Sequence, residues 1–161
     1  GSRVIDADTL ARIDALQTRY ARALDAKDMA GWAGCFGEEA SYVCIARENV
    51  EQDLPVAVMM DDSLARIRDR VTYIAKVWAG PFEDYQTRHF VQRVDCVSRG
   101  ALIAVESNFL VAYTTARGRS EILAAGTYED EIELAGGRAK FRAKKAILDT
   151  VTTPRYLVYP I

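Results

Sequence analysis

This 161-residue chain has few nitrogen and sulfur groups that could bind a metal, because it contains three cysteines and a single histidine, His89. A mononuclear iron site of the facial-triad type requires two histidines and a carboxylate, and a Rieske cluster requires two histidines and two cysteines. Cys35, Cys44 and Cys96 show no C-x-x-C spacing, which favours reduced, structural cysteines in a cytoplasmic protein. We therefore expect no metal or other cofactor in this chain.

His89 and Tyr20 are the side chains best suited by type to catalysis. His89 follows Arg88 at the start of a predicted strand, where its imidazole could act as a general base or could fix the strand end or an interface by hydrogen bonds. Tyr20 lies on the apolar face of a predicted helix, where its phenol could donate to an oxyanion in a cavity or pack in the core. No nucleophile motif and no phosphate-binding glycine loop accompanies them.

The composition indicates one soluble globular domain spanning residues 1–161, in which Gly1 and Ser2 resemble the remnant of a cleaved tag. The net charge of -2 gives no broad positive field, so we expect neither nucleic acid nor membrane as a partner. No apolar run approaches the roughly 20 residues that span a bilayer. These features predict a cytoplasmic location.

The first half of the chain is predicted to be helical with one strand. Apolar residues recur every three or four positions over residues 9–26, after Asp8 as the expected N-cap. A short helix should follow Asp28, with Met29, Trp32 and Phe36 on one face, and a strand is expected over 41–47. Residues 48–61, which include Pro55, are predicted to be a loop with an extended or bent piece.

A further helix is predicted after Asp61-Asp62, which we expect to cap it. Its apolar face comprises Leu64, Ile67, Val71, Ile74 and Trp78. Proline cannot continue a helix, so the helix should stop near Gly80-Pro81.

Beyond residue 85 the apolar period changes from nearly four to two, which predicts strands. The expected strands are 88–97, 101–115, 120–134 and 138–149, with turns at Gly100, Arg117-Gly118 and Gly136-Gly137. Helices followed by a long antiparallel meander imply an α+β layout in which a curved sheet wraps the helices. The cone so formed could hold a ligand or be filled by its own side chains.

The last predicted hairpin can be registered from its charges. A two-residue turn at Gly136-Gly137 places three opposite-charge pairs on one face. These pairs are Glu133–Lys140, Glu131–Arg142 and Glu129–Lys144. The same register places Leu134 against Ala139 and Ile132 against Phe141 on the other face.

The run RYARALDAKD at residues 19–28, followed by Trp32, Phe36 and the run ASY at 40–42, resembles the opening of the nuclear transport factor 2-like superfamily. The resemblance implies a cone-shaped α+β fold, with N-terminal helices packed on a strongly curved, mainly antiparallel sheet. That superfamily includes isomerases, dehydratases, polyketide cyclases and the β subunits of ring-hydroxylating dioxygenases, so its fold alone does not give a function.

Later motifs resemble the dioxygenase β subunits in order and spacing over nearly the whole chain. They are REN at 47–49, DDS at 61–63, RDRV at 68–71, TRHFV at 87–91, SNFLV at 107–111, GTYED at 126–130 and AILDT at 146–150. The resemblance implies a structural subunit of an aromatic-ring-hydroxylating dioxygenase, an oxidoreductase of aromatic hydrocarbon catabolism. The isolated chain would not itself be catalytic.

The resemblance also implies partners. A large α subunit would hold the Rieske 2Fe-2S cluster and the mononuclear iron, in an α3β3 hetero-oligomer with β–β trimer contacts that oxidises an aromatic compound, such as an aromatic carboxylate. Arg47, Arg70, Arg88 and His89 recur at the motif positions, and arginine suits interfaces because its planar fork binds carboxylates, so these residues are the interface candidates. Intrachain salt bridges are the alternative role for each.

A free-standing isomerase, dehydratase or cyclase that uses the cone is the alternative function, and a small-molecule binding module is another. Tyr20 matches the oxyanion tyrosine of the isomerases, but Cys44 stands where the resemblance places their catalytic aspartate. A scytalone dehydratase would need a histidine pair, and the chain has one histidine. Each enzyme reading therefore lacks a residue that its chemistry requires.

Overall fold

The computed structural model describes residues 4–54, 56–77, 85–150 and 157–161. Its helices are α1 (Ala7–Asp25), α2 (Met29–Ala33), α3 (Arg47–Glu51) and α4 (Leu64–Val77), and its strands are β1 (Phe36–Ala46), β2 (Met59–Asp61), β3 (Tyr85–Arg99), β4 (Leu102–Thr115), β5 (Ser120–Ala135) and β6 (Arg138–Leu148). The six strands form one sheet in the order β2-β1-β6-β5-β4-β3, in which only the β1–β6 pair is parallel. The predicted α+β fold with a mainly antiparallel sheet is confirmed.

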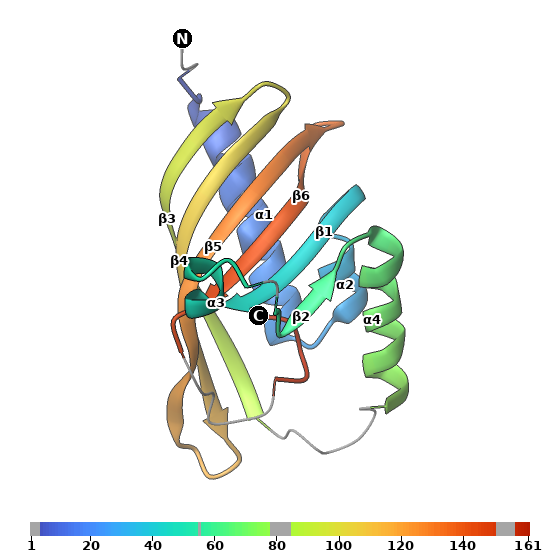
Figure 1. Cartoon of the computed structure of the whole chain (residues 1–161), viewed down its shortest axis with the longest axis vertical. Helices are drawn as coiled ribbons and strands as arrows, with labels where there is room; N and C mark the ends of the chain where they lie inside the picture. Colours follow the sequence, from blue (N-terminus) through green and yellow to red (C-terminus); the bar gives the residue numbers. More distant parts are fainter. Residues whose placement is uncertain (1–3, 55, 78–84, 151–156) are drawn as a thin grey trace.

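The sheet curves around α1, and α4 stands beside β1 and β2 (Figure 1). The apolar face predicted for α1 is buried, including Ile13, Leu16, Tyr20 and Leu24. The predicted N-cap is wrong, because Asp6 rather than Asp8 accepts the hydrogen bond from the Thr9 backbone N–H at 2.8 Å. Asp8 lies in the first turn instead, where a carboxylate also stabilises the helix.

The short helix α2 begins after Asp28, whose carboxylate accepts from the Gly31 backbone N–H at 3.0 Å as expected of an N-cap. Phe36 does not share this helix, because it already begins β1. The strand prediction for 41–47 therefore started too late. Phe36 still packs on Trp32, with ring centroids 5.2 Å apart, so the predicted contact exists without the predicted helix.

Residues 48–61 are predicted to be a loop with an extended or bent piece, and β2 is extended, but the segment also contains most of α3, which the prediction missed. β2 pairs antiparallel with β1 through Tyr42–Asp61, and this pairing is a tertiary contact that local sequence does not encode. The predicted cap of α4 is also wrong, since the Arg66 backbone N–H donates to Ser63 at 3.2 Å. Trp78 and the stop at Gly80-Pro81 lie outside the described residues.

The four long strands occur where the change of period predicted them, and the glycine turns are confirmed. Gly136 and Gly137 both have positive φ, which glycine adopts without strain and which a two-residue hairpin turn requires. β3 starts three residues before the predicted position and ends two residues beyond it.

The last hairpin follows the predicted register only near its turn. Glu133–Lys140, Leu134–Ala139 and Ile132–Phe141 pair as expected. A bulge then shifts the register, so that Glu131 faces Ala143 and Asp130 faces Lys144. The predicted pairs Glu131–Arg142 and Glu129–Lys144 are therefore wrong. Because side chains alternate along a strand, this one-residue shift turns Lys144 from the outer face into the core.

Candidate functional site

The interior of the cone is filled by aromatic side chains and by residues 157–161. Tyr20 is fully buried, and its hydroxyl donates to the main-chain oxygen of Ile161 at 2.6 Å. The Tyr42 hydroxyl donates to the same oxygen at 3.0 Å and accepts from the Ile161 N–H at 2.9 Å. Trp32, Phe36 and Phe141 pack edge-on around these two rings. The structure thus places Tyr20 in a packed core with its hydroxyl bonded.

A buried ion pair lies at the centre of this core. Lys144 and Asp130 have fully buried side chains, with Nζ 3.2 Å from Oδ2. Gln17 of α1 completes the network, because its Nε2 donates to Asp130 at 2.8 Å and its Oε1 accepts from Lys144 at 3.1 Å. The ammonium also lies 3.6 Å from the ring centroid of Tyr128 and 4.3 Å from that of Tyr20, which are cation–π contacts.

The sequence analysis missed this ion pair. Asp130 lies two residues from both Tyr128 and Ile132, so it shares their face of the strand. This alternation was a signal that the Asp130 carboxylate points inward. Nothing comparable marked Lys144, because its inward position depends on the bulge in β6.

Burial controls the protonation of the pair. Desolvation lowers the pKa of Lys144 to about 8 despite the opposing effect of Asp130, and desolvation raises the pKa of Asp130 above its usual value although Lys144 and Gln17 oppose this. Between about pH 8 and 10.5 the unfolded chain therefore binds more protons at this lysine than the folded chain does. A lysine whose pKa is lowered by folding makes stability rise with pH in this window.

We therefore expect the wild-type chain to gain stability between about pH 8 and 10.5, relative to the Lys144→Met/Asp130→Asn double variant, in which neither position titrates. Urea unfolding of both proteins at each pH measures the difference. The tyrosines titrate in both proteins, so their contribution to the pH dependence of stability cancels in the difference. A difference that stays flat or falls as the pH rises would show that Lys144 keeps its ordinary pKa.

His89 forms a second buried cluster with the end of α1. Its Nδ1 lies 2.6 Å from Oδ1 of Asp25, and its backbone N–H donates to Oδ2 of the same carboxylate at 3.1 Å. Thr87 adds a hydroxyl donor at 2.9 Å. Burial raises the pKa of Asp25, but the hydrogen bonds from His89 and Thr87 outweigh burial and leave the pKa below its usual value. The histidine thus fixes the strand end to α1, which is one of the two roles predicted for it.

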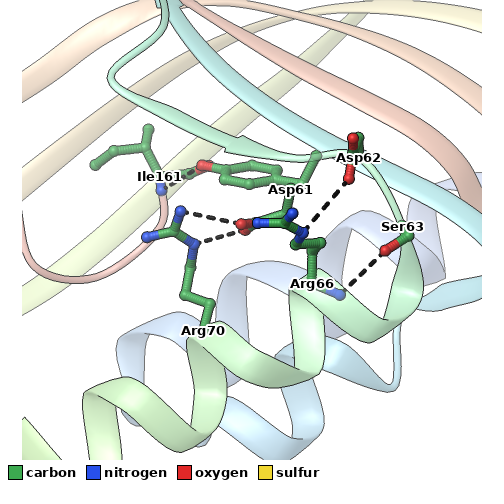
Figure 2. A network of polar contacts seen from close by, with 7 residues as sticks. Asp61, Asp62, Ser63, Arg66, Arg70 and Ile161 are labelled. Carbon is green, nitrogen blue, oxygen red and sulfur yellow. Dashed lines mark hydrogen bonds and ion pairs between the residues drawn. The ribbon is translucent and has the colours of Figure 1, made fainter.

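Two of the arginine candidates have intrachain partners. Arg47 pairs with Asp149, and its Nη2 donates to the Thr127 hydroxyl at 2.9 Å. Arg70 of α4 binds the buried Asp61 of β2 with both arms of its guanidinium, at 2.5 and 3.1 Å. Figure 2 shows this pair beside Ile161. Arg70 thus fixes α4 to β2 next to the segment that fills the cone.

Arg88 differs from the other candidates, because it is exposed and no hydrogen bond or ion pair to another described residue is found for it. It lies opposite Ala112, which in turn pairs with Ile122. The next exposed position on β3, Phe90, lies opposite Leu110. Phe90 is 60% exposed and Ile122 is 55% exposed. We call Arg88, Phe90, Leu110, Ala112 and Ile122 the outer patch.

Among the described residues, no group of three or more histidine, cysteine, aspartate or glutamate side chains is arranged to hold a metal ion. None of the described helices is both long enough and apolar enough to span a membrane. The fold and its contents define an α+β cone protein whose interior is occupied by its own side chains.

Comparison with known proteins identifies the family. Residues 19–155 match the family described as Ring hydroxylating beta subunit. The anthranilate 1,2-dioxygenase small subunit of Burkholderia cepacia is 31% identical over 157 residues, which cover 97% of this chain and 96% of that protein. The terephthalate 1,2-dioxygenase terminal oxygenase component subunit beta 2 of a Comamonas species is 24% identical over 151 residues, which cover 93% of this chain and 97% of that protein.

A solved structure from Novosphingobium aromaticivorans, assigned as the β subunit of an aromatic-ring-hydroxylating dioxygenase, has a TM-score of 0.78 and is 31% identical, covering 88% of this chain and 90% of that one. This chain therefore belongs to the ring hydroxylating beta subunit family, as its motifs predicted. It is a structural subunit of a dioxygenase, which is an oxidoreductase.

Proposed function

We propose that this chain carries no catalytic site and acts by assembling with a large α subunit that holds the Rieske cluster and the mononuclear iron. The donor set of the chain does not fit either group, because each requires two histidines and the chain has one. The filled cone supports the same proposal, since the tyrosine suited to an oxyanion already donates to Ile161. We infer an α3β3 complex with contacts between β subunits, in the cytoplasm.

We further propose that the complex oxidises an aromatic carboxylate. The support comes from relatives, since the two similar subunits described above belong to anthranilate and terephthalate dioxygenases. Both names denote aromatic acids. The described residues of this chain give no separate indication of the substrate, which would bind in the α subunit.

The outer patch is the observation that carries the assembly proposal. Exposed aromatic and aliphatic side chains beside a guanidinium that has no partner among the described residues match the composition of protein interfaces, where aromatic residues and arginine are enriched. Arg70 and His89 already bind carboxylates of this chain. Arg47 is bound on one side only, and 39% of its side chain is exposed. Among the four predicted anchors we therefore propose Arg88 first and Arg47 second.

Replacing Arg88 by alanine is expected to weaken co-purification with the α subunit and to leave the melting temperature of the isolated chain nearly unchanged. An interfacial arginine that loses its partner typically costs 2 to 5 kcal/mol of association, which is about 30-fold or more in affinity, whereas an exposed arginine contributes under about 1 kcal/mol to folding. Pull-down of the tagged α subunit and thermal melts measure the two effects.

Arg99→Ala is the matched control, because Arg99 is exposed near the other end of the same strand. Phe90→Ala tests the apolar part of the outer patch in the same assay. Normal assembly by both Arg88→Ala and Phe90→Ala would remove the outer patch from the interface. Catalytic turnover by the isolated wild-type chain would contradict the proposal that it carries no catalytic site.

A further inference from the structure

The outer face of the sheet carries a row of like charges. Asp95 of β3 lies opposite Glu106 of β4, and Glu106 lies opposite Glu129 of β5. All three residues are exposed, and none of them forms an ion pair with another residue that the structure describes. Lys145 of β6 lies next to Glu129 at the end of the row. Because like charges on facing strands destabilise a sheet, this row is unfavourable within a single chain.

The row lines a groove of about 490 Å³, to which Val97 and Ala104 contribute apolar surface. Asp130 also borders the groove, but its carboxylate is paired with Lys144 in the core. The other charged residues of the groove are four carboxylates and two cations, which give a net charge of -2: Asp95, Glu106, Glu129, Glu131, Arg99 and Lys145. Figure 1 shows no described helix in front of the sheet near the upper ends of β3 to β6. We call this surface the acidic groove.

The turn between β4 and β5 presents the opposite charge. Arg117 and Arg119 flank Gly118, which has the positive φ that glycine adopts without strain. The turn is closed by two backbone hydrogen bonds, in which Thr115 donates to Arg119 at 2.9 Å and Gly118 donates to Thr115 at 2.8 Å. Residues 116–119 are all exposed, and neither guanidinium has an ion-pair partner within the described ranges. We call residues 116–119 the basic tip, which projects below the rest of the sheet in Figure 1.

The acidic groove and the basic tip cannot meet within one chain. Glu106 and Thr115 are nine residues apart on β4, which is about 30 Å along a strand. The two surfaces therefore lie at opposite ends of one face of the sheet. Their opposite charges indicate a second copy of this chain as the partner of each.

The outer patch decides how two copies can be arranged. It lies between the two surfaces, because Leu110 and Ala112 stand between Glu106 and Thr115 on β4. A two-fold pair that joined tip to groove twice would press the two outer faces together and cover the outer patch. A head-to-tail contact uses one surface of each copy and leaves the patch open. Such heterologous contacts form a ring when the rotation between copies closes.

We propose that the basic tip of one copy binds in the acidic groove of the next, and that three copies close a head-to-tail ring. The two guanidinium groups of the tip offset the net charge of the groove. The number of copies and the open outer patch rest on the proposed function, in which the α subunit binds that patch in an α3β3 complex. The contact itself rests only on residues of this chain.

Reversal of charge tests the contact, with the mass of the purified chain measured by sedimentation in about 50 mM salt, where attraction between charges is weakly screened. Arg117→Glu/Arg119→Glu reverses the tip, and Glu106→Lys/Glu131→Lys reverses the groove. We expect a trimer for the wild-type chain and association at least about 10-fold weaker for each variant, because like charges then meet. The variant that combines all four substitutions should recover association to within about threefold, because opposite charges meet again.

Two further measurements separate docking from folding and from net charge. Glu106→Lys places a cation between Asp95 and Glu129, so attraction replaces repulsion along the row and the groove variant should keep a cooperative thermal melt. Arg68→Glu/Lys76→Glu is the matched control for the tip, because it changes the net charge equally at exposed positions of α4. Its association should stay within about threefold of the wild type.

A wild-type chain that stays monomeric at about 100 µM would overturn the proposal. So would a combined variant that associates no better than the tip variant or the groove variant. A dimer in place of a trimer would overturn the head-to-tail ring. Failure of the proposed function would be seen separately, as absence of the wild-type chain from pull-downs of the α subunit, in which the tip variant should still be retained through the outer patch.

Discussion

Replacing Lys144 by methionine is expected to lower the free energy of unfolding by about 3 to 5 kcal/mol. Methionine keeps most of the volume of lysine but leaves the Asp130 carboxylate buried without its counter-charge. It also removes the cation that lies 3.6 Å from the Tyr128 ring and 4.2 Å from the Phe141 ring. Urea denaturation of the purified chain measures the loss, provided that the transition is two-state.

The Lys144→Met/Asp130→Asn double variant should recover more than half of that loss. It removes both charges and keeps an amide beside Gln17, and replacing a whole buried ion pair is often nearly neutral. Lys145→Met is the matched control, because Lys145 is the next residue on the opposite face and should change stability by less than about 0.5 kcal/mol. Additive losses in the double variant would show that the pair does not act as a unit.

Gly126→Ala is expected to cost about 3 kcal/mol or more. A Cβ built at Gly126 would lie 1.9 Å from the main-chain oxygen of Ile147 and 3.2 Å from Cα of Leu148. Both atoms are backbone of β6, so β5 and β6 would have to separate. Chemical denaturation measures the cost, and we expect the Tm to fall with it.

Gly37→Ala provides the contrast, because Gly37 is also a buried strand glycine. There the added Cβ would meet only the carboxylate end of the Glu133 side chain, which can rotate away. We expect a loss of under about 1 kcal/mol for this variant. Similar small losses of stability in both alanine variants would mean that β5 and β6 can separate at little cost and that packing does not require glycine at position 126.

The sequence analysis located the long strands correctly because each of them carries a period of two over most of its length. The turn at Gly136-Gly137 could also be predicted from the sequence, since few residues other than glycine adopt positive φ at both positions. The register near that turn followed from Glu133–Lys140 and Ile132–Phe141. Alternation predicts which face a residue occupies only while the strand continues without a bulge, and the errors begin at the register shift between Glu131 and Ile132.

The caps and short elements were less predictable. Asp6 and Asp8 are both good N-cap residues, and the choice between them depends on where the backbone turns into the helix. β2 is three residues long and exists through its pairing with β1. No local pattern could mark it, because its stability comes from pairing with a strand that lies elsewhere in the sequence and not from its own residues.

The sequence by itself determined the α+β class, the family and the absence of a second histidine, because these depend on composition, periodicity and ordered motifs. Only the tertiary structure decided that Lys144 faces inward, that Asp61 pairs with Arg70, and that Tyr20 donates to a residue 141 positions away. Such contacts join segments whose separation along the chain carries no signal of their distance in space. The filled cone is therefore a property of the fold, produced by where the bulge turns Lys144 of β6 inward and where residues 157–161 return to the core.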